Sequence, residues 1–496
     1  MKKIFCLLAL LFFLLSTSQS QNYLGCFNNH YKKLTKTCID NYGVDTTAMW
    51  LSSWNLSNNI YPFSPIRPDS IPCRIYLDRS ADAPFGSSLY WNLPDVAAAV
   101  DLSTFYGNGN LAISAEAYVG DYLKRNTAKN GIILWGNHYY YNVIQDHTLR
   151  FVSNEQPQSV VFSLEKGDYH EMRPILPDWD LLFKWYPEAI KKHIRIAAQN
   201  HLVDSLSGEF NRHANGKSDY AFIESGGILI NSLCWLYSKT GDEELLILAE
   251  KILTYSYSNR NPNTGLVRNS PARERWDQKT STTEIGLWSN SVIKAIQYLP
   301  KEKREKWLII VENSLAPWLK FGFNKEKGMY YGALDVETAK PIFKTDNYPY
   351  KPDTFTSIWN PLIPRHDYPM QFAESCLMLY KLTHKEKYRN ACEKWIVTIN
   401  NQLEERKKRL IYAENYGRVC HFLLGYASEF QDKGAKKLAR VLMDEAVKSL
   451  YIKKQGMFRS HSGEMRYDAV DGLGILYFSA TWIETGISPI GASVYF

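Results

Sequence analysis

Beyond its first residues the chain has no long hydrophobic run, although 45% of its 496 residues are apolar. A membrane-spanning helix needs roughly 20 consecutive apolar residues, so the sequence predicts no transmembrane segment. The chain also lacks a Cys-x-x-Cys pair, which argues against a cysteine zinc site. Neither a Gly-x-Ser-x-Gly elbow nor a phosphate loop is present, since Gly216-Lys217-Ser218 lacks the upstream glycine. These absences argue against an α/β-hydrolase and against a P-loop nucleotide-binding protein.

The charge balance is mildly positive, without a basic tail. Lysine and arginine number 58 against 51 aspartates and glutamates, which gives a formal net charge of +7 at pH 7. Proteins that bind nucleic acid usually carry a strongly basic patch or stripe, so no nucleic-acid partner is expected. A mild positive excess favours an acidic small molecule or polysaccharide, because electrostatic attraction aids the encounter.

The amino terminus has the pattern of a secretory signal peptide. Met1-Lys2-Lys3 precedes an apolar run from Ile4 to Leu15, and small polar residues follow. The run is too short to span a bilayer, so we expect residues 1–20 to be removed before Gln21. The mature protein is therefore predicted to be periplasmic or secreted.

Cysteine usage fits such a compartment. Three cysteines lie in the front part of the chain and could include one disulfide: Cys26, Cys38 and Cys73. Four others lie within apolar helical patterns and are predicted to be buried thiols: Cys234, Cys376, Cys392 and Cys420.

Prolines divide the chain into an irregular front part and a helical remainder. Five prolines between positions 62 and 84 break any long helix, so residues 21–86 are predicted to form an irregular amino-terminal arm. From residue 87 onward apolar residues recur with helical spacing, and Pro94 is placed at the first helix start. The predicted helices cover residues 95–105, 112–124, 180–203 with a kink at Pro187, 219–240, 243–257, 281–299, 301–320, 367–383, 386–402, 413–430, 435–450 and 468–484. One short strand is predicted at residues 159–164.

Most of these helices pair into hairpins, and a weak internal repeat supports the pairing. Leu236-Tyr237 and Glu250-Lys251 flank one turn at the same spacing as Leu379-Tyr380 and Glu393-Lys394 flank another. About a dozen amphipathic helices can bury their faces together in a closed double ring, whose inner helices line a central funnel. The predicted fold is therefore all-α, an (α/α)6 toroid over residues 87–496, with the chemistry on loops at the funnel mouth.

Titratable residues gather in one stretch of the sequence. Six of the eleven histidines lie between Trp135 and His213, where uniform spreading would place about two. The same stretch contains Glu171, Glu209 and Arg212, and such clustering favours a chemical site. Three strings hold it: residues 134–141, 168–171 and 209–213, which read Leu-Trp-Gly-Asn-His-Tyr-Tyr-Tyr, Asp-Tyr-His-Glu and Glu-Phe-Asn-Arg-His.

The hairpins and these strings resemble the six-hairpin glycosidase superfamily, the (α/α)6 toroids among carbohydrate-active enzymes. Residues 209–213 and the string Arg459-Ser460-His461-Ser462-Gly463 are more loosely similar to secreted toroids described as β-glucuronidase-like hydrolases or as uronate lyases. The resemblance covers roughly residues 87–485. It implies an exported glycoside hydrolase that cleaves an acidic, uronic-acid-containing oligosaccharide or polysaccharide.

Glycoside hydrolysis needs one carboxylic acid to protonate the leaving oxygen and a second carboxylate to activate water or attack the sugar. The candidate carboxylates are Glu171, Glu209, Glu224, Asp277 and Glu284. Glu209 is the first choice, because it follows the turn at Gly208 and lies near Arg212 and His213, which would tune its charge. Glu171 is the second choice. The alternative for each is an ordinary role in an ion pair or a helix cap.

Other residues are predicted to hold the substrate. Arg212 could bind a carboxylate through two parallel hydrogen bonds, and Trp276 could stack on a sugar ring. His213 would help to tune the acid. The full set of expected binding residues is Arg212, Asn211, Trp135, Tyr139, His170, Arg275, Trp276, Asp277 and His461.

Two other functions stay open. A polysaccharide lyase would need a base and an acid near the substrate carboxylate, which His138 and Tyr139 could supply. The string Asn137-His138-Tyr139 resembles the Asn-Asn-His-x-Tyr pattern of helical-toroid alginate lyases, with Gly136 in place of the first Asn. The other alternative is a glycan-binding toroid without catalytic activity.

The histidines are not arranged like a typical metal site. Pro174 stands four residues after His170, so the His-Glu-x-x-His zinc pattern is missing. His193 and His201 are eight residues apart, two helical turns, which is too far to share one ion. His193 is predicted to be a solvated helix residue and His201 a core residue. No metal or other cofactor is expected.

Overall fold

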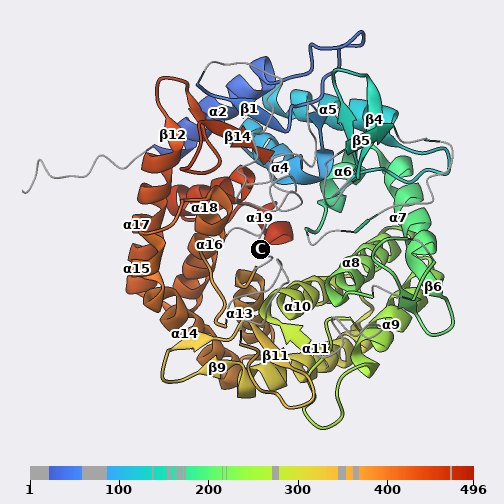
Figure 1. The fold of residues 1–496 in the computed structure, drawn as a ribbon, viewed down its shortest axis with the longest axis vertical. Coiled ribbons are helices and arrows are strands. Elements are labelled where there is room, and N and C mark those ends of the chain that lie inside the picture. The colour runs from blue at the N-terminus through green and yellow to red at the C-terminus, as the bar shows by residue number, and fades with distance from the viewer. Residues whose placement is uncertain are drawn as a thin grey trace, which may run out of the picture.

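The computed structural model describes residues 22–57, 86–136, 139–152, 158–161, 164, 171–172, 175–214, 216–218, 221–270, 279–343, 354–360, 368–469 and 472–496. These residues form two concentric layers of helices around one axis (Figure 1). The inner layer consists of α4 (Leu89–Phe105), α8 (Ile223–Thr240), α10 (Thr282–Ile296), α13 (Met370–Thr383), α16 (Ala413–Phe430) and α18 (Leu473–Thr485). The outer layer consists of α5 (Asn110–Asn126), α7 (Pro187–His201), α9 (Glu243–Ser258), α11 (Lys301–Phe321), α14 (Glu386–Asn401) and α17 (Lys433–Leu450).

The two layers differ in composition because they bury different amounts of surface. In α8 every residue from Ile223 to Leu236 is buried, and α18 is apolar nearly all round. In α17 only a stripe at helical spacing is buried, and the opposite face is rich in lysine. A helix that is apolar on all sides belongs inside, and an amphipathic one belongs at the surface. The predicted all-α double ring, the (α/α)6 architecture, is confirmed.

The ring closes between α4 and α8 through the short helix α6 (Trp179–Trp185) and the segment before it. The Tyr90 hydroxyl of α4 donates to the carbonyl of Ile175 at 2.5 Å. The Trp179 indole donates to the Ser232 hydroxyl of α8 at 3.0 Å. These hydrogen bonds close the ring at the position where α4 and α8 do not pack directly along their length.

Short strands connect the helices. The largest sheet is antiparallel and runs in the order β2 (Gly86–Ser87), β3 (Tyr139–Asn142), β4 (His147–Val152), β5 (Gln158–Val161). Five two-stranded pairs follow: β1 (Ser53–Asn55) with β14 (Arg466–Asp468), β6 (Leu202–Asp204) with β7 (Glu209–Phe210), β8 (Lys279–Ser281) with β11 (Ala333–Asp335), β9 (Phe323–Asn324) with β10 (Met329–Tyr330), and β12 (Tyr451–Ile452) with β13 (Met457–Phe458). The strand predicted at residues 159–164 corresponds to β5.

Three expectations about helices are corrected. Residues 21–86 contain the helix α2 (Tyr23–Thr37), which packs against α18 and is capped by the Asn22 side chain. The five prolines of this part all come after this segment, so none of them interrupts the helix. Pro94 lies inside α4 rather than at its start. The helix predicted over residues 180–203 is instead two helices, α6 and α7, separated at Tyr186, and residues 202–203 belong to β6.

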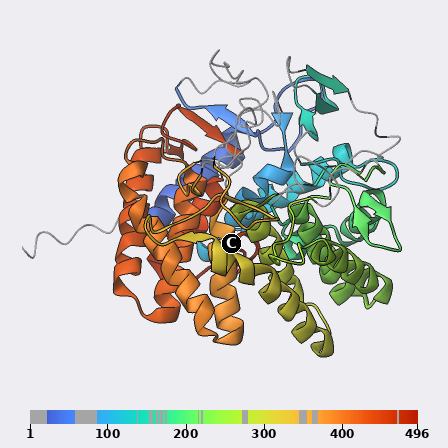
Figure 2. The ribbon, with the colours of Figure 1, turned by 60° about the horizontal axis from the view of Figure 1, so that its bottom comes forward.

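The buried thiols are where the sequence predicted them. The four helical cysteines, from Cys234 to Cys420, are buried and free, and Cys26 and Cys38 are free as well. Cys73 lies outside the described residues, as do residues 1–21, which include the predicted signal peptide. No described helix combines the length and the apolar character needed to cross a membrane. Figure 2 shows the ring helices in a view turned by 60° from that of Figure 1. Two further short helices, α15 (Leu403–Arg406) and α19 (Ala492–Tyr495), complete the described elements.

Close backbone contact between α18 and α4 depends on Gly474. A Cβ atom there would overlap the backbone of Pro94 and lie 2.7 Å from the Asp95 nitrogen. Backbone cannot move aside as a flexible side chain can, so Gly474→Ala is expected to lower the free energy of unfolding by about 2–3 kcal/mol. Urea unfolding checks this. Gly109→Ala is the control, since its Cβ would meet only Ile113 Cδ1 at 3.9 Å; an equal loss in both variants would contradict the explanation.

Candidate active site

Polar side chains line the end of the ring where the inner helices begin. Glu224, Glu284 and Glu414 lie in the first turns of α8, α10 and α16, and Gln371 lies in the first turn of α13. All four are buried. A carboxylate is favoured at a helix amino terminus by the helix dipole, yet it costs free energy to bury one without partners. Three such carboxylates at equivalent helix positions mark this end as the candidate site.

Hydrogen bonds join neighbouring helix starts at this end. The backbone N–H of Tyr368, just before α13, donates to the Thr283 hydroxyl of α10 at 2.7 Å. The Tyr368 hydroxyl donates to Glu414 Oε1 of α16 at 2.5 Å. The first turns of α10, α13 and α16 are therefore neighbours on one face, which we call the catalytic face together with the first turn of α8.

Arg212 lies between two carboxylates of the catalytic face. Its Nε and Nη2 donate to Glu171 Oε1 at 3.1 and 2.8 Å, and its Nη1 lies 3.8 Å from Glu224 Oε1. His213 Nε2 is 3.6 Å from the same Glu171 oxygen. Arg212, Glu171 and Glu224 are all buried. One guanidinium thus bonds Glu171 and approaches Glu224, and all three groups are buried, where charge interactions are strong.

The local fold fixes Arg212. His201 ends α7, and its backbone carbonyl accepts from Asn211 N at 2.7 Å, while its Nδ1 lies 2.6 Å from the Asn211 carbonyl. The Arg212 carbonyl accepts from Met172 N at 3.1 Å, which ties this hairpin to the strand of chain carrying Glu171. The Phe222 ring lies 5.3 Å from the guanidinium carbon. Arg212 is therefore held on several sides before any substrate binds.

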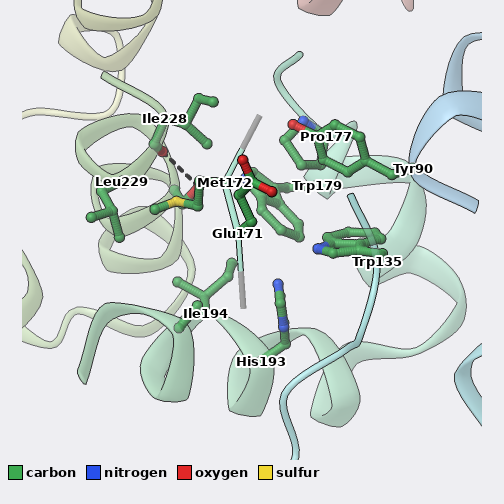
Figure 3. A pocket seen from close by; sticks show the side chains of 12 residues that line it. Tyr90, Trp135, Glu171, Met172, Pro177, Trp179, His193, Ile194, Ile228 and Leu229 are labelled. Atoms are coloured by element: carbon green, nitrogen blue, oxygen red, sulfur yellow. Dashed lines mark hydrogen bonds between the residues drawn. The ribbon is translucent and has the colours of Figure 1, made fainter. Parts of the chain in front are cut away.

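A small cavity borders Glu171 (Figure 3). Its volume is about 30 Å³, which holds one or two water molecules and no sugar ring. Its lining is mostly apolar and consists of Tyr90, Trp135, Glu171, Met172, Pro177, Trp179, His193, Ile194, Ala197, Ile228, Leu229 and Ser232. This apolar backing excludes bulk water from one side of the Glu171 carboxylate.

The two histidines of α7 are core residues. Burial lowers the pKa of His193 to about 3. His201 has its pKa lowered to about 4, chiefly by burial, against the hydrogen bond to the Asn211 carbonyl, which raises it. The expectation for His201 is confirmed, whereas His193, with 2% of its surface exposed, is not the solvated residue that the sequence predicted. Its ring packs against Trp135 and Trp179, and its Nδ1 accepts from Ile133 N at 3.0 Å, which offsets part of the cost of burying it.

This burial predicts an acid sensitivity. The folded pKa of His193, about 3, lies below the unfolded value of 6.5, so its stabilising effect is complete above pH 6.5 and is lost as the pH falls toward 3. His193→Gln removes the titration. The drop in unfolding free energy between pH 6.5 and 4 is therefore expected to be smaller in this variant by roughly 2–3 kcal/mol. Urea titrations at both pH values measure it, with the exposed His147→Gln as control; an unchanged drop would refute the role of His193.

A second cluster occupies the opposite part of the catalytic face. Arg418, one turn into α16, donates from Nε and Nη2 to Glu414 Oε1 at 3.3 and 3.2 Å. Its guanidinium carbon lies 4.0 Å from the centre of the Tyr368 ring. Glu414 Oε1 therefore receives three donors, two from Arg418 and one from Tyr368.

His461 lies beside the start of α16. Its ring stacks on Tyr412 with centroids 5.1 Å apart, and its Nε2 is 3.3 Å from Arg466 Nη2. The same arginine nitrogen lies 3.5 Å from Asp468 Oδ2. His461 is thus near the catalytic face, on the side of α16 and α18, while Glu171 and Arg212 lie on the side of α8.

The sequence placed Glu209 in one cluster with Arg212 and His213, but in the structure Glu209 lies apart from these two residues. The β6–β7 hairpin packs on α9 of the outer layer, with Gly208 against the backbone of Lys251. The Tyr255 hydroxyl of α9 forms a hydrogen bond with the Glu209 carboxylate. Arg212 and His213, which were expected to tune the charge of Glu209, contact Glu171 instead.

Three expected binding residues are packed inside the protein. Trp135 is 2% exposed and contacts Tyr90, Trp179 and His193 through its ring. Tyr139 belongs to a small separate core, and Asn211 is fully buried in its hairpin. None of these side chains offers the open surface that sugar stacking needs, because the surrounding aromatic and hairpin contacts cover it. The other expected residues, His138, His170, Arg275, Trp276 and Asp277, lie outside the described residues.

The sequence interpretation missed Glu414, Arg418 and Tyr368. A signal for Glu414 exists, since Glu284 and Glu414 both stand in the first turn of a predicted helix, but it is visible only once those helices are known to start on one face. Among the residues that the structure describes, no group of three His, Cys, Asp or Glu side chains is arranged to hold a metal ion.

No family model matches the chain. Its backbone is similar to that of a sugar epimerase from a ruminal bacterium, at 9% identity and a TM-score of 0.48, over 94% of this chain and 99% of that chain. It is also similar to an unsaturated glucuronyl hydrolase specific for heparin, at 12% identity and a TM-score of 0.45, over 94% and 98%. A third similar structure is the GH76A α-1,6-mannanase from Salegentibacter sp. HEL1_6, at 8% identity and a TM-score of 0.46, over 92% and 98%.

Proposed function

We propose that the chain is a glycoside hydrolase that cleaves an acidic, uronic-acid-containing glycan at the catalytic face. The observation that supports this most is the pair Glu171 and Glu224 on either side of the Arg212 guanidinium. Hydrolysis of a glycosidic bond needs two carboxyl groups in different protonation states. Two buried acids that share one cation unequally provide such a difference.

We assign the general acid to Glu224 and the ionised partner to Glu171. Arg212 donates two hydrogen bonds to Glu171 and only approaches Glu224, at 3.8 Å. The closer guanidinium stabilises negative charge on Glu171 more than on Glu224, so Glu224 takes up a proton more readily. Glu209 is no longer the first choice for the acid, because it pairs with Tyr255 on the outer layer.

The acidic substrate and the location remain part of the same proposal. The mildly positive net charge of the chain would attract an anionic sugar. Removal of residues 1–20 by signal peptidase would place the enzyme in the periplasm or outside the cell, where such glycans are encountered.

Product analysis on a panel of glucuronate-terminated and other uronate-bearing oligosaccharides tests the reaction class. We expect saturated sugar to be released, without the ultraviolet absorbance of an unsaturated uronate. Absorbance that rises with cleavage would replace the hydrolase by the lyase that the sequence left open. Binding without turnover over the whole panel would favour a glycan-binding toroid.

A further inference from the structure

Residues 491–496, the axial segment, return to the middle of the ring after α18 ends (Figure 1). Tyr495 and Phe496 are each 3% exposed. The Phe496 ring stacks on His421 of α16 with centroids 3.8 Å apart and planes 10° from parallel. The Tyr495 ring stacks on Phe478 of α18 at 5.6 Å. The axial segment is therefore packed against the inner helices α16 and α18.

Polar side chains of three other inner positions hold its backbone. Lys294 Nζ of α10 donates to the Val494 carbonyl at 2.8 Å. Gln371 Nε2 of α13 and Arg418 Nη1 of α16 donate to the Tyr495 carbonyl at 3.1 and 2.7 Å. Buried hydrogen-bond donors need acceptors. The backbone carbonyls of the axial segment accept the hydrogen bonds that these three side chains would otherwise donate to water.

Arg418 connects the axial segment to the catalytic face. While Nη1 contacts the Tyr495 carbonyl, Nε and Nη2 contact Glu414 Oε1, and the guanidinium lies over the Tyr368 ring. The guanidinium is planar and has N–H donors on several edges. If the acceptor on one edge moves, the whole group rotates, and the donors on the other edges move with it. The orientation of Glu414 and Tyr368 therefore depends on where the axial segment sits.

We propose that the axial segment is a positioning element of the active site: through the Tyr495 carbonyl it fixes Arg418, and Arg418 fixes Glu414 and Tyr368 on the catalytic face. This rests on the proposed function for its effect on catalysis, but the positioning itself does not. Glu414 and Tyr368 then contribute to binding or orienting the sugar opposite Glu171 and Glu224. A displacement of about 1 Å at such residues is enough to change a rate about 10²-fold.

The test compares three variants with the full-length protein: removal of residues 491–496, Phe496→Ala, and Arg418→Lys, which keeps a charge but not the planar fork. Ile490→Ala is the matched control, since this neighbouring side chain is 92% exposed. Amide hydrogen exchange of residues 413–418 is measured in each, together with kcat and KM on the best uronate oligosaccharide and the melting temperature.

In the variants, exchange at residues 413–418 is expected to rise at least about 10-fold. We expect kcat to fall about 10²-fold while KM changes far less. Ile490→Ala should match the wild type in every measurement. Folded variants with wild-type exchange at residues 413–418 would overturn the proposal. If the wild type cleaves no glycan, the proposed function fails, and the exchange measurement still decides whether the axial segment positions Glu414. Phe496→Ala and Arg418→Lys keep the test decisive if the shortened chain does not fold.

Discussion

Replacing Glu224 by glutamine is expected to lower kcat/KM on the cleaved glycan by about 10²–10⁴-fold, the usual contribution of general acid catalysis. Glutamine has the same shape and keeps an oxygen near Arg212, but it carries no proton that it can give to the leaving oxygen. The fold should survive, because glutamine matches a protonated glutamic acid in shape and in charge, and the Arg212–Glu171 ion pair stays in place. The measurement is steady-state kinetics, with urea unfolding to show that stability is kept.

Glu209→Gln is the matched control for Glu224→Gln. Glu209 is a carboxylate of the same type, bonded to Tyr255 on the outer layer. Its replacement is expected to leave kcat/KM within about twofold, as for most substitutions away from a site. A wild-type rate in Glu224→Gln with a large loss in Glu209→Gln would reverse the assignment and restore the acid that the sequence favoured.

Arg212→Met is expected to lower the free energy of unfolding by about 3–5 kcal/mol, because it leaves buried carboxylates without their counter-charge. Methionine fills similar space without a charge, so the loss reports electrostatics more than packing. Urea unfolding measures it.

The double variant Arg212→Met with Glu171→Gln separates the two explanations for such a loss. A buried ion pair that is removed completely often costs little, whereas one orphaned partner costs much. We therefore expect the double variant to recover at least half of the stability lost in Arg212→Met. A loss below about 1 kcal/mol in Arg212→Met, or no recovery in the double variant, would show that the contact does not organise the site.

Helical parts of the fold were predictable because their pattern is local. The predicted boundaries of residues 413–430 coincide with α16, and most other helices begin and end within a few residues of the prediction. The repeat around Thr240-Gly241 and Thr383-His384 is explained by two hairpins of the same kind, whose inner helices both end in a left-handed residue, Gly241 and His384. Hydrophobic periodicity and caps carry this information in the sequence.

The sheet was predictable only in part. Strand β3 consists of Tyr139–Asn142, and all four residues are buried. The alternation of buried and exposed residues that identifies a half-buried strand is therefore missing. Helix α2 was missed for a different reason. The prolines led to the prediction of an irregular arm over residues 21–86, but all of them lie after this helix.

The candidate site was predictable in part, because titratable residues are concentrated between Trp135 and His213. Glu171, Arg212 and His213 were placed together, and the structure brings them within hydrogen-bond or ion-pair distance. Glu414 and Arg418 were not singled out, because a glutamate and an arginine four residues apart look like an ordinary surface pair on a helix. Only the closed ring shows that this pair faces inward and meets residues 491–496.

The most direct test of the central claim, that the sugar is cleaved at the start of the inner helices, is a crystal structure of Glu224→Gln with an oligosaccharide that the wild type cleaves. We expect the glycosidic oxygen within about 3 Å of the side chain at position 224, and the sugar against the first turns of α8, α10 and α16. An oligosaccharide bound beside Glu209 on the outer layer, or at the end of the ring where the inner helices finish, would contradict the account.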